Sequence, residues 1–262
     1  MNPVRPRQSL SRAVNIFLAL GFLLGVLPCA LAKSEDPASI FRRANAAYRG
    51  GDYAQAAMLY ESWIAQGGRS ATLSYNLGNT YFKQGRVGLA LVQYERAKKS
   101  APRDRDIAAN LNYVQGLLEY RVEDRRNWYL KALDTVLAAF TEKEIGILSL
   151  ALGFLFWLSW VFSLYLRPDA LWGWRRKTLL TLTLVIFGFW FLKGFHGLTV
   201  QEAIVLKPQA TVRYGPSYKD QMALRLGEGI KVRVTKQEGG WSRIVLANGD
   251  TGWIPQEEME VI

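Results

Sequence analysis

Residues 71–104 read ATLSYNLGNTYFKQGRVGLALVQYERAKKSAPRD, and a looser copy of this stretch precedes it at about 37–70. Compared at an offset of 34 residues, the two copies carry identical or similar residues. The pairs are Ala44 and Gly78, Asn45 and Asn79, Tyr48 and Phe82, Gly51 and Gly85, Ala56 and Ala90, and Tyr60 and Tyr94. Self-similarity at a fixed period of this length is typical of stacked repeats. Small Gly78 and Ala90 let two antiparallel helices approach, and Tyr81 and Tyr94 can fill the space around them.

The second copy closely resembles the tetratricopeptide repeat. The matching positions are Leu77, Gly78 and Tyr81 on a first helix, Gln84-Gly85 at the turn, Ala90, Tyr94 and Ala97 on a second helix, and Pro102 as the stop. The first copy departs from the family pattern at Trp63, where alanine is usual, and at Gly68, where proline is usual. The resemblance implies two antiparallel helices in each repeat.

A closing helix is expected after the second copy. Residues 106–118 carry apolar side chains at helical spacing, namely Ile107, Leu111, Val114 and Leu118. We therefore predict an all-α tetratricopeptide-repeat domain over 37–120, with repeats at about 37–70 and 71–104 and a capping helix. Two repeats and a cap are the least that can bury the apolar face of a solenoid, so help is expected from the linker or amphipathic segment 121–144 or from a partner.

The first helices of such repeats line a concave groove. Mapped onto this chain, the predicted peptide-binding residues of the groove are Asn45, Tyr48, Arg49, Tyr75, Asn79, Phe82 and Lys83, with Phe41 beside them. Asparagine and cations next to aromatic residues suit an extended peptide or its terminal carboxylate, in partial resemblance to the carboxylate-clamp subtype. The same residues equally fit a solvated helix face or packing against a neighbouring repeat. On the first interpretation, Asn79 and Lys83 can be changed to alanine without unfolding the domain.

Two apolar runs follow the repeats and predict a hairpin of transmembrane helices. Residues 145–166 hold 22 uncharged residues, enough to cross the roughly 30 Å hydrocarbon core of a bilayer. The second predicted span, 178–200, has only 15 uncharged residues before Lys193, so it spans only if that cation reaches the headgroups. The alternative is a pair of buried helices in a soluble domain.

Charge at the ends of the apolar runs predicts their direction in the membrane. Arg167, Arg175, Arg176 and Lys177 crowd the loop 167–177, and short basic loops stay in the cytoplasm. Residues 1–32 combine three arginines, twenty uncharged residues and an Ala-Leu-Ala ending, which is typical of a secretory signal peptide. Both signals place 33–144 and 201–262 on the periplasmic side of a bacterial inner membrane, so we predict a multi-pass protein there.

A small β module is expected after the second span. From residue 203 apolar and polar residues alternate in five or so short strands broken by glycine turns. Asn248-Gly249 predicts a hairpin, since both central residues of such a turn favour positive φ. The spacing of Gly215-Pro216, Gly240-Trp241 and Gly252-Trp253 resembles bacterial SH3-like domains, which implies a small all-β barrel over 203–262. Its predicted ligand-facing residues are Tyr214, Trp241 and Trp253, with Tyr218, although tryptophan in so small a barrel is often core.

The residues needed for catalysis do not converge in this sequence. The only histidine, His196, lies at the end of the second apolar run, and the only cysteine, Cys29, lies in the predicted signal peptide. This excludes a Ser-His-Asp triad and histidine or cysteine metal sites from the soluble parts. Seven of the eleven excess positive charges flank apolar segments, so no basic face is available for nucleic acid. We predict no enzyme activity, no cofactor, no metal and no nucleic-acid partner.

The order of these parts resembles the BatE proteins of the bacterial aerotolerance (Bat) operon. That resemblance implies a non-catalytic role beside membrane-anchored von Willebrand factor A proteins and a MoxR-type ATPase. We therefore interpret the chain as a multidomain membrane protein that acts as a scaffold, binding other membrane or periplasmic proteins. The alternative is a cell-wall sensor whose SH3-like domain binds peptidoglycan peptides.

The topology can be tested with reporter fusions. Fusions after Lys131, within 172–176 and after Ile262 should report outside, inside and outside, because the basic loop is retained in the cytoplasm. Paired alkaline-phosphatase and fluorescent-protein reporters would measure each position, and any other order contradicts the predicted topology.

Overall fold

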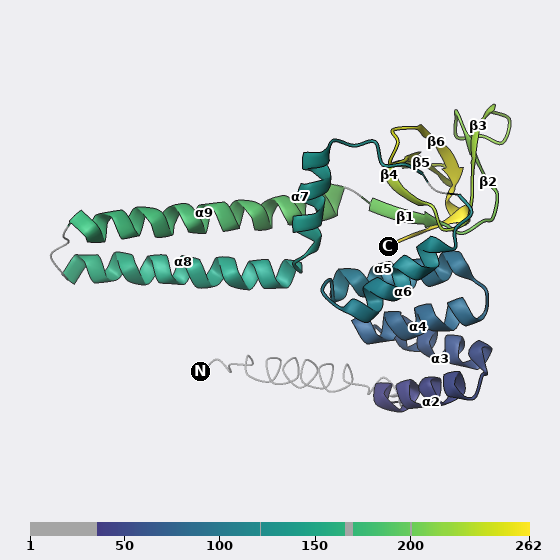
Figure 1. The fold of residues 1–262 in the computed structure, drawn as a ribbon, viewed down its shortest axis with the longest axis horizontal. Helices are drawn as coiled ribbons and strands as arrows, with labels where there is room; N and C mark the ends of the chain where they lie inside the picture. Colours follow the sequence, from purple (N-terminus) through teal and green to yellow (C-terminus); the bar gives the residue numbers. More distant parts are fainter. Residues whose placement is uncertain (1–35, 121, 166–169, 200) are drawn as a thin grey trace, which may run out of the picture. The chain divides into compact units, whose positions relative to one another are not determined.

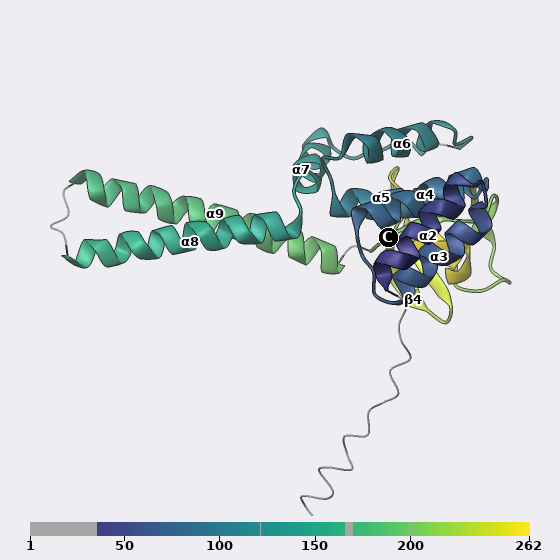
Figure 2. The same ribbon diagram turned by 90° about the horizontal axis from the view of Figure 1, so that it is seen from below.

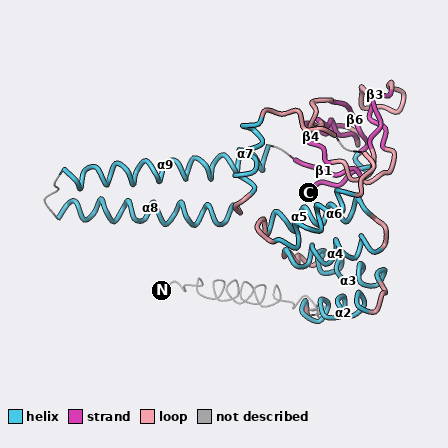
Figure 3. The backbone as a smooth tube through the Cα atoms, in the orientation of Figure 1, coloured by secondary structure: helices cyan, strands magenta, loops and turns pink. Residues whose placement is uncertain are grey.

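The computed structural model describes residues 36–120, 122–165, 170–199 and 201–262 (Figure 1). The predicted signal peptide and Arg167 lie outside the described residues. The chain divides after Ser39, and the described residues of the second unit, Ile40–Ile262, form one compact body. In the described part, helices precede residue 200 and strands follow it (Figure 3).

Five helices form the repeat region. They are α2 (Pro37–Arg49), α3 (Tyr53–Ala65), α4 (Ala71–Lys83), α5 (Val87–Ser100) and α6 (Arg105–Gly116). The starts of α4 and α5 each lie 34 residues after those of α2 and α3, so the helices recur with the period of the sequence.

Local sequence explains where the repeat helices begin and turn. Asp52, Ser70 and Asp104 accept backbone hydrogen bonds as N-caps of α3, α4 and α6. Gly51 and Gly85 occupy equivalent turns with φ of 82° and 76°, a conformation that costs glycine little.

The helical core confirms the predicted close approach of the paired helices. A Cβ added at Gly78 would lie 2.9 Å from the Tyr94 ring, so only glycine fits there. Tyr60, Tyr81, Ala90 and Tyr94 are buried around it. The Tyr81 hydroxyl donates to Glu61 Oε1 at 2.6 Å.

The C-terminal part is a seven-stranded antiparallel sheet in the order β3-β2-β6-β5-β4-β1-β7. The strands are β1 (Gln201–Val205), β2 (Ala210–Arg213), β3 (Met222–Leu226), β4 (Lys231–Glu238), β5 (Trp241–Val245), β6 (Thr251–Pro255) and β7 (Met259–Val261), with a 3-10 turn η1 (Gln256–Glu258) before the last. Inward residues such as Val212, Val232, Ile244 and Ile254 form its core.

The hairpin between β5 and β6 is confirmed, but its predicted turn conformation is wrong. Gly249 has a φ of 97°, whereas no non-glycine residue in the described part has positive φ. The connection is the longer loop 246–250, closed by a bond from Gly249 N to Leu246 O. Asn248 acts through its side chain instead, because its Oδ1 accepts from Asp250 N at 3.1 Å.

The sheet packs against the repeat helices within the second unit. Ile204 of β1 belongs to the buried core of the repeats. Gly229 has a φ of 85°, and a Cβ there would lie 2.6 Å from Leu118, so the β3–β4 turn meets the helices closely. The sheet therefore covers part of the helical core, and the two soluble parts that were predicted as separate domains are in contact.

Polar contacts extend the same interface. Gly88 N donates to Glu228 Oε1 at 2.6 Å, and Arg96 pairs with Glu260 at 2.8 Å. Lys231 lies 3.0 Å from Glu202 and 3.4 Å from the buried Glu95. In these ion pairs each charged side chain has a partner of opposite charge, which offsets the cost of partly removing it from water.

Three helices connect the repeats with the sheet: α7 (Trp128–Ala138), α8 (Glu142–Tyr165) and α9 (Ala170–Thr199). α8 and α9 lie side by side in two views (Figures 1 and 2). Their segments Glu142–Val161 and Lys177–Gly194 are long and apolar enough to cross a membrane. Within these segments 11% and 0% of the residues are buried, which disfavours the alternative of buried core helices.

The predicted loop 167–177 is helical from Ala170 onward. Arg175, Arg176 and Lys177 therefore lie in the first turns of α9. Arginine and lysine are good helix formers, so the helix continues through them. The cytoplasmic position of these cations stays a prediction.

Replacing Lys231 with alanine should destabilise the soluble part by about 1 kcal/mol, because it removes the cation of Glu95 and the nearer cation of Glu202, which keeps Lys99 at 3.7 Å. Lys236→Ala is the matched control, since Lys236 pairs with exposed Glu238 and contacts the Trp253 ring but meets no buried charge, and should change stability little. Thermal unfolding of the detergent-solubilised chain measures both, and equal melting temperatures would contradict the role of Lys231.

The effect of Lys231 should depend on pH. Burial raises the pKa of Glu202, but Lys231, Lys99 and Arg233 outweigh it and hold that pKa below its ordinary 4.5. The contribution of Glu202 is thus present at neutral pH and is lost as the pH falls below about 4.5. The difference between wild type and Lys231→Ala should shrink over that range.

Candidate peptide-binding site

A three-residue hydrogen-bond cluster is centred on Asn45, which lies on the first helix of the first repeat. Asn45 Oδ1 on α2 accepts from the Tyr60 hydroxyl of α3 at 2.5 Å and from Asn76 Nδ2 of α4 at 3.2 Å. One amide oxygen thus joins three consecutive helices. Because Tyr60 is buried, its hydroxyl needs this acceptor.

The second repeat builds the same cluster from residues 34 positions later. Asn79 Oδ1 on α4 accepts from the Tyr94 hydroxyl at 2.7 Å and from Asn110 Nδ2 of α6 at 2.9 Å. Asn110 therefore stands in α6 where Asn76 stands in α4. The predicted capping helix is in register with the first helices of the repeats.

A pocket of about 150 Å³ opens beside these clusters. Its lining residues are Asn45, Tyr48, Arg49, Tyr60, Asn76 and Asn79. The structure thus brings four of the seven predicted groove residues together. Their proposed role in binding peptide stays a prediction.

The other three predicted groove residues lie elsewhere. Tyr75 packs its ring 6.0 Å from that of Tyr94 and accepts from Asn110 through its hydroxyl. The Phe82 ring lies 5.9 Å from Tyr113, edge to face. Lys83 is exposed in the last turn of α4 and does not line the pocket.

Sequence reasoning missed Tyr60 and Asn76 as lining residues. Tyr60 was recognised only as the repeat partner of Tyr94. Asn76 has no counterpart in the first copy, where Arg42 stands 34 residues earlier, but Asn110 stands 34 residues later. Extending the 34-residue comparison into 105–116 would have found it.

Hydrogen-bond donors dominate the polar lining of the pocket. Burial raises the pKa of Tyr60 to about 12, and burial also raises the pKa of Tyr94, so both hydroxyls stay protonated and donate to asparagine. Among the described residues the amide nitrogens of Asn45 and Asn79 make no hydrogen bond, and Arg49 is exposed. Amide N–H groups and a guanidinium favour a ligand with carbonyl or carboxylate oxygens.

The sheet carries a second group of predicted site residues. Tyr214 and Tyr218 are exposed in the β2–β3 loop. Trp253 is half-buried, with Lys236 Nζ 5.9 Å from its ring centroid. Trp241 is only 7% exposed and packs edge-on against Tyr218 at 4.8 Å. The prediction that Trp241 faces ligand is therefore wrong, because its ring contributes to the packing beneath Tyr218.

Within the described ranges, no three histidine, cysteine, aspartate or glutamate side chains come together to hold a metal ion.

Comparison with known proteins identifies one part of the chain. Residues 207–260 match the family model described as bacterial SH3 domain. This covers most of the predicted SH3-like region and the loop that carries Tyr214 and Tyr218. No curated protein is significantly similar to the chain.

The asparagine clusters give Asn79→Ala a structural cost besides any effect on binding. This substitution should cost about 1–3 kcal/mol, because the buried Tyr94 hydroxyl loses its acceptor. Tyr94→Phe should cost less, about 0.5–1.5 kcal/mol, because Asn79 still accepts from Asn110. Denaturant unfolding followed by circular dichroism compares them, and a costlier Tyr94→Phe would contradict the cluster.

Proposed function

We propose that the protein is a non-catalytic scaffold, anchored in the bacterial inner membrane, that binds extended segments of other membrane or periplasmic proteins. The pocket beside Asn45 and Asn79 is the observation that carries this proposal. Its free amide N–H groups and Arg49 match the backbone carbonyls and terminal carboxylate of a peptide. The 34-residue period and the helix pairs support assigning the helical region to the tetratricopeptide repeats.

The anchor in this proposal is the α8–α9 hairpin, with both soluble parts on the periplasmic side. Support comes from the length and apolar character of both helices and from the three cations at the start of α9. The order of the parts resembles BatE proteins, which favours a Bat-type complex with von Willebrand factor A proteins as partners.

Packing between the sheet and the repeats places both binding surfaces of the scaffold in one compact unit. The contact of Ile204 with the helical core and the Lys231 ion pairs fix the sheet on α5. A partner that contacts both surfaces would gain affinity from this fixed spacing, because little conformational freedom is lost on binding.

A second candidate function is binding of peptidoglycan peptides by the sheet. The bacterial SH3 match and the exposed Tyr214 and Tyr218 favour it. On this hypothesis the solubilised full chain co-sediments with purified cell wall and Tyr218→Ala reduces the bound fraction. Equal sedimentation of the two proteins, or none, would remove this candidate.

Reversing the charge at the pocket should weaken peptide binding. Arg49→Glu places a carboxylate beside the acceptor-rich ligand and should lower affinity about tenfold, which corresponds to roughly 1.4 kcal/mol. Arg69→Glu is the matched control, because Arg69 is equally exposed but lies in the α3–α4 turn away from the pocket lining.

The measurement is quantitative affinity capture from membranes, with partners identified by mass spectrometry and then assayed as synthetic segments by fluorescence anisotropy. Recovery that falls for Arg49→Glu and not for Arg69→Glu supports the pocket. Equal recovery of all three proteins places peptide binding elsewhere on the chain.

A further inference from the structure

α7 and Phe140, two residues beyond its end, present an exposed apolar face. Tyr129, Leu133, Val136 and Phe140 follow one another at helical spacing, and each is exposed, Leu133 by 47% and Val136 by 50%. None of the residues of α7 is buried. In a soluble domain this face of an amphipathic helix would pack on the core.

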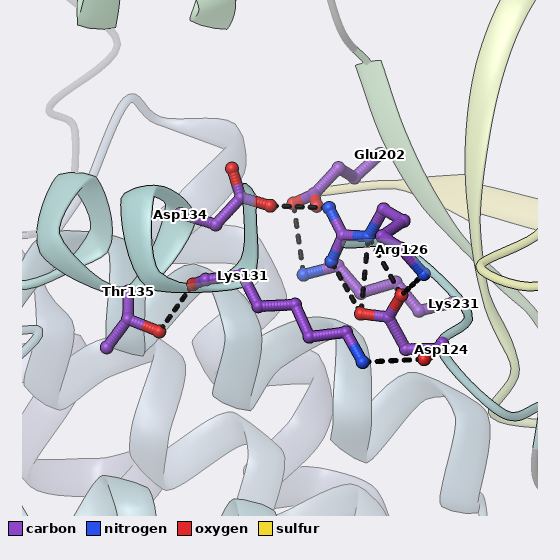
Figure 4. Close-up of polar contacts among 7 residues, drawn as sticks. All are labelled: Asp124, Arg126, Lys131, Asp134, Thr135, Glu202 and Lys231. Atoms are coloured by element: carbon purple, nitrogen blue, oxygen red, sulfur yellow. Dashed lines mark hydrogen bonds and ion pairs between the residues drawn. The ribbon is translucent and has the colours of Figure 1, made fainter. Parts of the chain in front are cut away.

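The polar side of α7 is held by the segment directly before it. Arg126 of that segment donates to Asp134 at 2.5 Å and to Asp124 at 2.8 Å, and Lys131 Nζ donates to the backbone oxygen of Asp124 at 2.6 Å. Figure 4 shows these side chains gathered between α7 and the segment before it. The polar side of α7 therefore has partners in the chain, whereas its apolar side is exposed.

The end of α7 is fixed to the membrane hairpin. Lys193 Nζ of α9 donates to the backbone oxygen of Leu137 at 2.5 Å and also to that of Phe140. A cation at a helix C-terminus satisfies carbonyls that lack partners and complements the helix dipole. Lys193 is also the charged residue that interrupts the second apolar run. The C-terminal end of α7 therefore lies beside that interruption.

The start of α8 follows shortly after the end of α7 and also carries charged side chains. Thr141 N donates to Glu144 Oε2 at 2.9 Å, and Glu144 N donates to Thr141 Oγ1 at 3.2 Å, which is a capping box. Arg103 pairs with Glu144 and lies 5.7 Å from the Phe140 ring centroid. Charged and aromatic side chains thus gather where the apolar helix begins, as at a bilayer–water boundary.

We propose that α7 lies in the headgroup region of the bilayer, with the face formed by Tyr129, Leu133, Val136 and Phe140 in lipid. This inference rests on the proposed membrane anchor, because the covering surface is continuous with the lipid around α8. Exposed apolar surface of this extent needs a cover, and an interfacial helix buries its apolar face at the boundary of headgroups and acyl chains. α7 then fixes how far the soluble part stands from the membrane.

Spin labels on the full chain can test this placement. In a Cys29→Ser background, single labels would be attached through Leu133→Cys on the apolar face, Ala138→Cys on the exposed opposite side and Leu150→Cys in α8. The protein would be reconstituted in vesicles of phosphatidylethanolamine and phosphatidylglycerol. Collision rates with oxygen, which concentrates in lipid, and with a water-soluble nickel chelate report the surroundings of each label.

The label at Leu133 should collide with the nickel chelate about threefold less often than the label at Ala138 and more often with oxygen, because it lies in lipid. Leu150 is the internal control for the anchor. If Leu133 and Ala138 are equally accessible to nickel while Leu150 is in lipid, the placement of α7 is overturned and the anchor stands.

Two further results would overturn the inference in other ways. If the label at Leu150 is also open to the nickel chelate, the anchor itself fails. If the label at Leu133 is protected from both reagents, protein covers the face, and spin–spin broadening would identify a second copy of the chain as that protein.

Discussion

The side-chain oxygen of one asparagine in each repeat is the acceptor on which the helical array depends. Tyr60 and Tyr94 fill the space between paired helices, and each brings a hydroxyl into the interior. A buried hydroxyl without a partner costs about 1–3 kcal/mol, and Asn45 and Asn79 remove that cost. Asn76 and Asn110 donate to the same oxygens, so packing within a repeat and stacking on the next helix use one group. Because the side-chain oxygens of Asn45 and Asn79 accept bonds from the interior, their amide nitrogens remain available to a ligand in the pocket.

Closing the ends of a short array is the second constraint. Two helix pairs leave apolar side chains on the last helices, and the chain covers them with its own sheet. Ile204 enters the helical core and Gly229 allows the β3–β4 turn to approach Leu118 and Leu91. The pocket and the exposed tyrosines of the sheet therefore belong to the same compact unit.

Sequence predicted the parts whose cause is local. The 34-residue period and the glycine turns predicted where the helix pairs of the repeats lie, and the caps at Asp52, Ser70 and Asp104 act within the same short stretches. Alternation and turn glycines predicted the β character of the C-terminal part, although the sheet has seven strands where five or so were expected. Sequence left open whether Trp241 faces ligand or packs in the core, because the answer depends on Tyr218 lying against it from another loop. The structural role of Asn79 was missed for the same reason, since both of its donors come from other helices.

The exposed apolar face of α7 shows how far a local pattern can be taken. Periodicity identifies the apolar face of 128–140, but it does not say which face the protein covers. That depends on Arg126, which holds Asp134 and Asp124 together on the polar side, and on Lys193, which is 53 residues away from Phe140 in sequence. A lone ammonium within an apolar run is costly in hydrocarbon, and so are the unpaired carbonyls at a helix end. One contact between Lys193 and the end of α7 gives partners to both the ammonium and those carbonyls.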